Sequence, residues 1–189
     1  LQTNGGGYLG AATQIASQFL QQGQLVVYTE GRSQRPERFT AQAGGQFTSG
    51  ALAILTNEYT ASAAEIVSGA VQDHDRGMII GRRTFGKGLV QRPLSLPDGS
   101  MIRLTTAHYY TPSGRCIQKP YVKGDRKDYD MDVVNRLNHG ELTSIDSIHL
   151  DSTKVYKTDL GRTVYGGGGI MPDIFVPADT SRYTAFYTA

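Results

Sequence analysis

The sequence contains a single cysteine, Cys116, among its 189 residues. An internal disulfide is therefore excluded, and no spacing of cysteine and histidine suggests a zinc site. No apolar run approaches the roughly 18 residues needed to span a bilayer. We also find no signal peptide in the sequence.

A strong excess of one charge is absent too. The 19 basic and 17 acidic residues leave a net charge of +2, without a basic cluster. We therefore expect neither a nucleic-acid partner nor an acidic membrane surface. A hydrophobic share of 39% and a charged share of 19% are typical of a soluble globular protein. The length allows one domain, or one domain with a large insertion, around a sizeable core.

The chain begins abruptly, with Leu1-Gln2-Thr3-Asn4 running into Gly5-Gly6-Gly7. This pattern is typical of the end of a strand followed by a glycine turn, where positive φ and close backbone approach are permitted. A natural N-terminus rarely starts inside an element. We therefore interpret the chain as an excised fragment from which targeting information has been removed.

Strands and helices are predicted to alternate in the first half of the chain. Residues 11–20 carry apolar side chains at helical spacing, and Gly23 is predicted to end that helix. Residues 25–29 predict a strand, residues 31–38 a polar loop, and residues 51–55 a buried strand. This order predicts an α/β domain with a largely parallel sheet.

The second half has two different characters. A short apolar strand is predicted at residues 77–81, and residues 89–96 and 101–110 form a predicted hairpin around Pro97-Asp98-Gly99. Residues 119–165 are rich in Lys, Asp, Tyr and Asn and contain one weakly amphipathic helix, near residues 131–137. We expect a core at residues 1–118, a charged insertion at 119–165, and a return to the core at 166–189.

The chain is organised around Ser62 and Lys87. Apolar residues at 66, 67, 70 and 71 predict one face of a helix, so Ser62 should lie where a strand turns into a helix. A nucleophile gains there from the free amides and the positive end of the helix dipole. Lys87 stands between two glycines with Phe85 and Leu89 beyond them. Apolar surroundings favour a neutral lysine, which could accept the Ser62 proton.

Two other interpretations compete with this pair. Ser62 and Glu65 have the Ser-x-x-Glu spacing of a capping box, so Ser62 could merely cap the helix. Lys87 could be a solvated turn residue. A Ser-His-Asp triad also stays open, because triads assemble in space, although none of the four histidines (His74, His108, His139 and His149) has a recognisable partner pattern.

Several motifs in a fixed order nevertheless resemble a known family. They are residues 60–67 (TASAAEIV), 72–73 (QD), 84–88 (TFGKG) and 90–91 (VQ). They resemble the core signature of the C-terminal processing peptidases, also called tail-specific proteases, which are serine peptidases with a Ser/Lys dyad. The similarity extends to residues 4–7, 96–100, 105–117 and 169–173. The resemblance implies a crotonase/ClpP-like α/β core, and no metal ion or organic cofactor.

The resemblance also implies roles for individual residues. Ser62 matches the nucleophile, Lys87 the general base, and Gln91 a glutamine that orients the lysine amine; a shared strand would place Lys87 and Gln91 on one face. Ala63 matches one amide of the oxyanion hole, and Gly6 or Gly7 is expected to supply the other. The remaining match is Asp73, an acid whose role we interpret as structural.

The expected function is that of a serine endopeptidase core that cleaves polypeptides, bound in extended form, near their C-termini through an acyl-enzyme. The alternative is a catalytically silent peptide-binding or scaffold module on the same fold. The family usually carries a PDZ domain, which these residues lack, and has few residues where 119–165 stand here. A periplasmic or cell-envelope location is implied by the family alone. Substrate, specificity, oligomeric state and the role of the insertion stay open.

Overall fold

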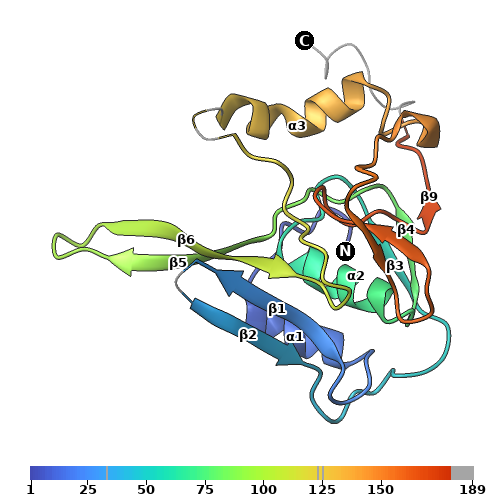
Figure 1. Ribbon diagram of the computed structural model, residues 1–189, viewed down its shortest axis with the longest axis horizontal. Helices are drawn as coiled ribbons and strands as arrows, with labels where there is room; N and C mark the ends of the chain where they lie inside the picture. The colour runs from blue at the N-terminus through green and yellow to red at the C-terminus, as the bar shows by residue number, and fades with distance from the viewer. Residues whose placement is uncertain (33, 123, 125, 180–189) are drawn as a thin grey trace.

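A short parallel sheet lies at one side of the molecule, on the right in Figure 1, and the helix that follows its first strand lies beside it towards the middle. The structure is a computed structural model that describes residues 1–179 except residues 33, 123 and 125. The sheet has the order β3-β4-β9, with both pairs parallel. Its strands are β3 (Ala53–Thr56), β4 (Met78–Gly81) and β9 (Ile174–Phe175), and α2 (Ala63–Asp73) connects β3 to β4. The predicted strand–helix–strand unit is confirmed here.

The larger sheet is antiparallel. Its order is β2-β1-β6-β5, formed by β2 (Gln34–Thr40), β1 (Leu25–Gly31), β6 (Met101–Tyr110) and β5 (Leu89–Ser95). The prediction of a largely parallel sheet is therefore wrong, and so is that of a polar loop at 31–38. Residues 35–38 are exposed on an edge strand, so they carry no apolar alternation by which a strand is read from sequence.

Helix α2 is buried on every side. Each of its residues is buried, and a Cβ on Gly69 would lie 2.9 Å from the Thr111 Cγ2 atom. A helix enclosed in this way belongs to the core rather than to the surface. Helix α1 (Leu9–Ser17) packs against it. The predicted helix at 11–20 thus ends early, at Ser17, and Gly23 lies in the following turn rather than at the helix end, which corrects that expectation.

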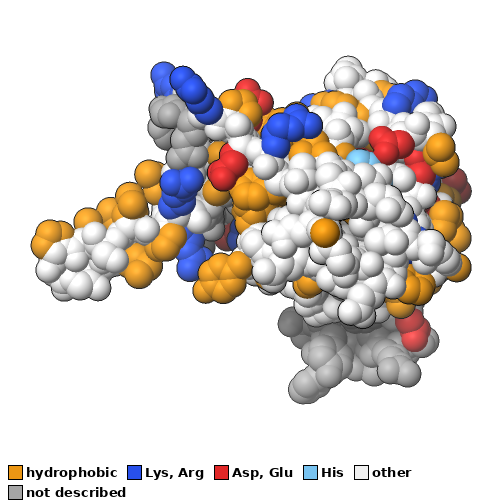
Figure 2. Space-filling view, turned by 90° about the horizontal axis from the view of Figure 1, so that it is seen from below, with side chains coloured by type: hydrophobic (Ala, Val, Ile, Leu, Met, Phe, Trp, Pro, Cys, Tyr) orange, Lys and Arg blue, Asp and Glu red, His pale blue; other side chains and the backbone are white. Residues whose placement is uncertain are grey.

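The hairpin of β5 and β6 projects from the body as an arm (Figure 1). Gly99 has φ +84° in its turn, as the Asp98-Gly99 pair predicted. Hydrophobic side chains lie exposed along the arm (Figure 2). They are Leu94, Leu96, Met101, Ile102 and Leu104.

Residues 119–165, called the insertion below, contain regular structure. Helix α3 (Arg126–Asn138) lies on the opposite side of the molecule from α1 (Figure 1). A short 3₁₀ turn (Ile145–Ser147) and a hairpin of β7 (Val155–Lys157) and β8 (Thr163–Tyr165) follow. Within the part of the chain that the structure describes, no helix is long and apolar enough to cross a membrane.

Candidate active site

Ser62 occupies a strained turn directly before α2. Its backbone has φ 57° and ψ −120°, a conformation that costs a residue with a side chain on the order of 1–3 kcal/mol. A sharp turn of this kind at a strand-to-helix junction exposes a serine hydroxyl at the helix N-terminus. The predicted position of Ser62 between a strand and a helix is therefore confirmed.

Ser62 and Glu65 form the capping box that their spacing predicts. The Ser62 side chain faces the Glu65 N–H, which also donates to the Ser62 carbonyl oxygen at 2.8 Å. The Ser62 N–H in turn donates to the Glu65 carboxylate at 2.8 Å. The interpretation of Ser62 as a helix cap therefore stays open beside its interpretation as a nucleophile.

The buried Glu65 carboxylate joins the two candidate segments. Its Oε2 atom accepts the N–H groups of Ser62 and Lys87, both at 2.8 Å. Its Oε1 atom accepts the Thr84 hydroxyl at 2.5 Å and the Gly86 N–H at 2.7 Å. One carboxylate therefore fixes the Ser62 turn against the loop that carries Lys87, although the two lie 25 positions apart in the sequence.

The burial of Glu65 is opposed by these four donors. The pKa of Glu65 is raised, because burial raises it more than the four hydrogen bonds lower it. Three of the donors are backbone N–H groups, which can only donate, and the fourth is the Thr84 hydroxyl, which can also accept. The sequence suggested only a capping partner for Ser62, and its link to Lys87 was missed because the link forms across the fold.

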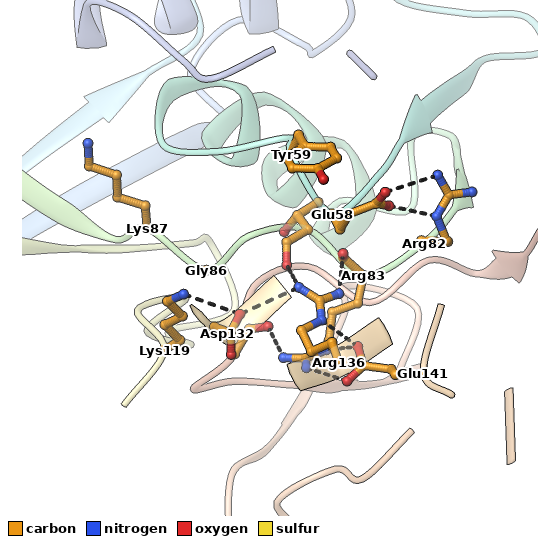
Figure 3. Close-up of polar contacts among 12 residues, drawn as sticks. Glu58, Tyr59, Arg82, Arg83, Gly86, Lys87, Lys119, Asp132, Arg136 and Glu141 are labelled. Carbon is orange, nitrogen blue, oxygen red and sulfur yellow. Dashed lines mark hydrogen bonds and ion pairs between the residues drawn. The ribbon is translucent and has the colours of Figure 1, made fainter. Parts of the chain in front are cut away.

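The Lys87 side chain faces a large cavity. It is half-buried and lines a cavity of about 910 Å³ together with Leu89 and Gln91. Lys87 points away from the ion pairs beside it (Figure 3), and no hydrogen bond joins its amine to the Ser62 hydroxyl. The dyad bond itself is thus not formed in this state.

Gln91 shares the cavity with Lys87, but not for the expected reason. Strand β5 begins at Leu89, and its pairing with β6 is irregular between Val90 and Gln91. Lys87 lies before the strand, so the argument from a shared strand face is wrong. The two side chains line the same cavity because the loop and the strand both border it.

The glycine turn lies against the Ser62 turn. Gly6 has φ +98°, and a Cβ there would lie 2.7 Å from the Ala61 carbonyl oxygen and 2.8 Å from the Ala63 nitrogen. The Gly6 N–H donates to the Asn4 side chain at 2.9 Å. By contrast, the N–H groups of Gly7 and Ala63 donate to no other described residue. The free Gly7 and Ala63 amides therefore lie next to the close contact between Gly6 and the Ser62 turn.

Asp73 lies at the far end of α2 in a buried ion pair. Its Oδ1 atom accepts the fully buried Arg115 guanidinium at 2.7 Å, and its Oδ2 atom accepts the Ser113 N–H at 3.0 Å. Both carboxylate oxygens are engaged by the segment that follows β6. This geometry agrees with the structural role that we expected for Asp73.

The histidines take no part in this arrangement. His74 lies between the Asp159 carboxylate and the Leu25 carbonyl oxygen, both at 2.7 Å. His108, which lines the cavity, is exposed, and no hydrogen bond joins a histidine of the described residues to Ser62. Across the same residues, no cluster of three or more His, Cys, Asp or Glu side chains could hold a metal ion.

Sequence comparison gives one family and several relatives. The model of peptidase family S41 matches residues 1–128. A carboxy-terminal-processing protease of Bartonella bacilliformis is 46% identical over 119 residues, which are 62% of this chain and 27% of that protein. A carboxyl-terminal-processing protease of a Picosynechococcus species is 44% identical over 119 residues, 63% of this chain and 28% of that protein.

A solved structure extends the similarity to most of the fold. The photosystem II D1 C-terminal processing protease superposes with a TM-score of 0.63 at 26% identity, covering 93% of this chain and 33% of that one. This similarity agrees with the expected ClpP-like α/β core. The chain spans about a quarter of the length of the curated relatives that it matches.

Proposed function

The chain belongs to peptidase family S41, and on this premise we propose that it forms the catalytic core of a serine endopeptidase that processes the C-termini of polypeptides. Ser62 is the nucleophile and Lys87 the general base. The observation that carries the proposal is the Glu65 carboxylate, which holds the strained Ser62 turn and the Lys87 loop on one oxygen atom.

The proposed reaction has two steps. The Ser62 hydroxyl attacks the scissile carbonyl carbon while neutral Lys87 accepts its proton, and Lys87 then donates that proton to the leaving amine as the C–N bond breaks. A water molecule attacks the resulting ester as Lys87 takes its proton, and Lys87 passes that proton to the Ser62 oxygen as the ester C–O bond breaks, which releases the acid product and restores the Ser62 hydroxyl. Because no hydrogen bond joins Ser62 and Lys87 in the absence of substrate, we expect substrate binding to bring the two side chains into hydrogen-bond distance.

The oxyanion of each tetrahedral intermediate requires two donors. Ala63 at the start of α2 provides one N–H, which is free of other partners. We assign the second to Gly7 rather than Gly6, because the Gly6 N–H already donates to Asn4. Loss of one such donor typically costs about 100- to 1000-fold in rate.

The substrate is proposed to lie extended along β5. This strand is the edge of its sheet and starts two residues after Lys87, so a peptide could pair with it through main-chain hydrogen bonds. Pro93 has no N–H to donate, which limits such pairing to residues 89–92. Side chains of the peptide would then enter the cavity that Lys87 lines.

Three wider expectations remain proposals. Residues 119–165 are an insertion within the peptidase core, and residues 166–189 return to it, with β9 in this stretch; residues 180–189 lie outside the described residues. The intact protein carries a substrate-capturing PDZ domain as the family commonly does. Its location is outside the cytoplasm, which is supported by relatives that are bacterial or chloroplastic processing proteases.

The test is replacement of each dyad residue in the intact protein. Ser62→Ala and Lys87→Ala should each lower kcat on the order of 10⁴- to 10⁶-fold, as removal of a residue that acts in such a unit does. A fluorophosphonate probe should label the wild-type protein at Ser62 and neither variant. Lys157→Ala removes a lysine that lies outside the cavity and should leave kcat unchanged. Wild-type turnover by either dyad variant would overturn the dyad assignment, whereas a wild-type protein that neither cleaves peptides nor labels at Ser62 would favour the catalytically silent scaffold.

A further inference from the structure

The loop that carries Lys87 is held from two sides. Glu65 accepts the N–H groups of Gly86 and Lys87 from the core. On the other side, the Lys119 N–H of the insertion donates to the Gly86 carbonyl oxygen at 2.9 Å. Residues 82–88 have no regular secondary structure of their own, so the position of Lys87 depends on these outside contacts.

Arg136 of α3 binds the backbone of this loop from the insertion. It is 4% exposed. Its guanidinium donates to the Thr84 carbonyl oxygen at 3.1 Å and to the Arg83 carbonyl oxygen at 2.7 Å. A planar guanidinium fixes both acceptors in one geometry, which a lysine ammonium cannot do.

Glu141 fixes the orientation of that guanidinium. Its Oε1 atom accepts the Arg136 Nε–H at 2.8 Å. The same carboxylate binds Arg83 in a bidentate pair at 2.7 and 2.6 Å, and Arg83 also donates to the Gly168 carbonyl oxygen at 2.7 Å. The carboxylate thus lies between two arginines, one from each side of the contact (Figure 3).

The ion pairs that Glu141 makes with Arg83 and Arg136 do more than add stability. Buried ion pairs often contribute little net stability, because desolvation offsets their attraction, and their best-attested effect is to fix one arrangement of the chain. Here the fixed arrangement is that of Arg83 and Thr84, which lie four and three residues before Lys87. Thr84 is also the residue whose hydroxyl donates to Glu65. The contacts from Glu65 and from Arg136 therefore act on the same short segment.

We infer that Arg136 is a positioning residue for Lys87, and that the insertion thereby forms part of the active site. The inference rests on the proposed function only for its effect on turnover. Its structural content is that the guanidinium of α3 sets the position of residues 83–87. Arg136 lies beyond residues 1–128, so this support lies outside the stretch that the family model matches.

Arg162 offers a matched control. It too belongs to the insertion and reaches the core with all three guanidinium nitrogens, which bind Asp75 at 2.5 Å, Asp173 at 2.6 Å and the Gln72 carbonyl oxygen at 3.2 Å. These contacts lie at the C-terminal end of α2, away from the Lys87 loop. If loosening the insertion were the whole effect, replacing Arg136 or Arg162 should lower activity equally. Loss of positioning should lower activity only when Arg136 is replaced.

The experiment compares Arg136→Gln, Arg136→Lys and Arg162→Gln in the intact protein. Arg136→Gln should lower kcat about 10- to 100-fold with KM within about twofold, because a misplaced catalytic group costs rate rather than binding. Labelling of Ser62 by a fluorophosphonate should slow by the same factor. Arg136→Lys should recover part of the loss, and Arg162→Gln should retain wild-type kcat. Equal losses in both glutamine variants, or full kcat in Arg136→Gln, would overturn the inference.

Hydrogen exchange supplies a readout that does not depend on catalysis. Exchange of the Gly86 and Lys87 amides should accelerate at least about tenfold in Arg136→Gln and stay at the wild-type rate in Arg162→Gln. If the wild-type protein neither cleaves peptides nor labels at Ser62, the proposed function fails, and this exchange result still decides the positioning role. Exchange of the Gly86 and Lys87 amides at the same rate in Arg136→Gln and Arg162→Gln would contradict the positioning role of Arg136.

Discussion

At the scale of single residues, the site depends on one carboxylate and one strained serine. Glu65 lies in the interior with four donors around it, so its desolvation is offset only while all four remain in place. The Ser62 backbone is held at positive φ by the same contact. Strain that persists under such restraint is common where a nucleophile is presented.

The strain at Ser62 can be measured by relieving it. The free energy of unfolding of Ser62→Gly should exceed that of Ser62→Ala by about 1 kcal/mol. Glycine adopts positive φ without the penalty of roughly 1–3 kcal/mol, and its greater conformational freedom in the unfolded chain offsets part of that gain. Both variants should be inactive. Urea denaturation of the two proteins gives the comparison, with alanine as the reference that lacks the hydroxyl but keeps the Cβ. If the glycine variant were the less stable, the turn would not be strained.

At the scale of elements, the insertion is attached to the core by ionised carboxylates. Burial of Glu141 works against ionisation, but the hydrogen bonds and charges of Arg83 and Arg136 outweigh it and lower the pKa of Glu141. Asp75 is similar: burial opposes ionisation, while the Leu160 N–H and the Arg162 guanidinium lower the pKa of Asp75. Both attachments therefore depend on pH in the same direction.

The insertion should detach in acid before the core unfolds. A carboxylate whose pKa is lowered by folding stabilises fully above its unfolded value, about 4, and loses that contribution as the pH falls through the folded value. We expect the amides of α3 and of β7 and β8 to lose exchange protection as the pH falls below about 4, ahead of those in α2. Simultaneous loss in α2 and α3 would contradict this order, and Glu141→Gln should shift the loss in α3 to higher pH.

At the scale of the whole molecule, the cavity beside Lys87 has two walls of different origin. The core provides one side, including Leu89 and Gln91. The insertion provides the other, and its lining side chains are Lys119, Tyr121, Tyr129, Asp130, Lys154 and Tyr156. A substrate that enters this cavity would therefore contact residues outside the family match as well as inside it.

Truncation of one tyrosine should weaken substrate binding without slowing the chemistry. Tyr156→Ala removes part of the cavity wall on β7, so KM for a peptide with a large apolar side chain should rise about 5- to 30-fold at unchanged kcat, as loss of roughly 1–2 kcal/mol of apolar contact predicts. Leu160→Ala alters a highly exposed residue of the insertion that does not line the cavity and should leave KM unchanged. Steady-state kinetics on the intact protein tests both, and an unchanged KM in Tyr156→Ala would place the substrate elsewhere.

Much of the central unit could be predicted from sequence because its signals are local. The apolar strand before Ser62, the helix after it and the Asp98-Gly99 turn each follow from neighbouring residues, and the structure confirms them. The strand β2 could not be read in this way, since an exposed edge strand is specified by hydrogen bonds to β1 and not by its own pattern. The roles of Ser62, Lys87, Gln91, Ala63 and the glycines stay predictions.

The sequence by itself determined which residues could do chemistry, because residue type and motif order are properties of the chain. Only the tertiary structure decided how they meet. Glu65 reaches Lys87, and Arg136 reaches Thr84, across 22 and 52 positions, and no local pattern encodes such a contact. The physical reason is that a buried charge must find its partners wherever packing places them, so these contacts are fixed by the fold as a whole.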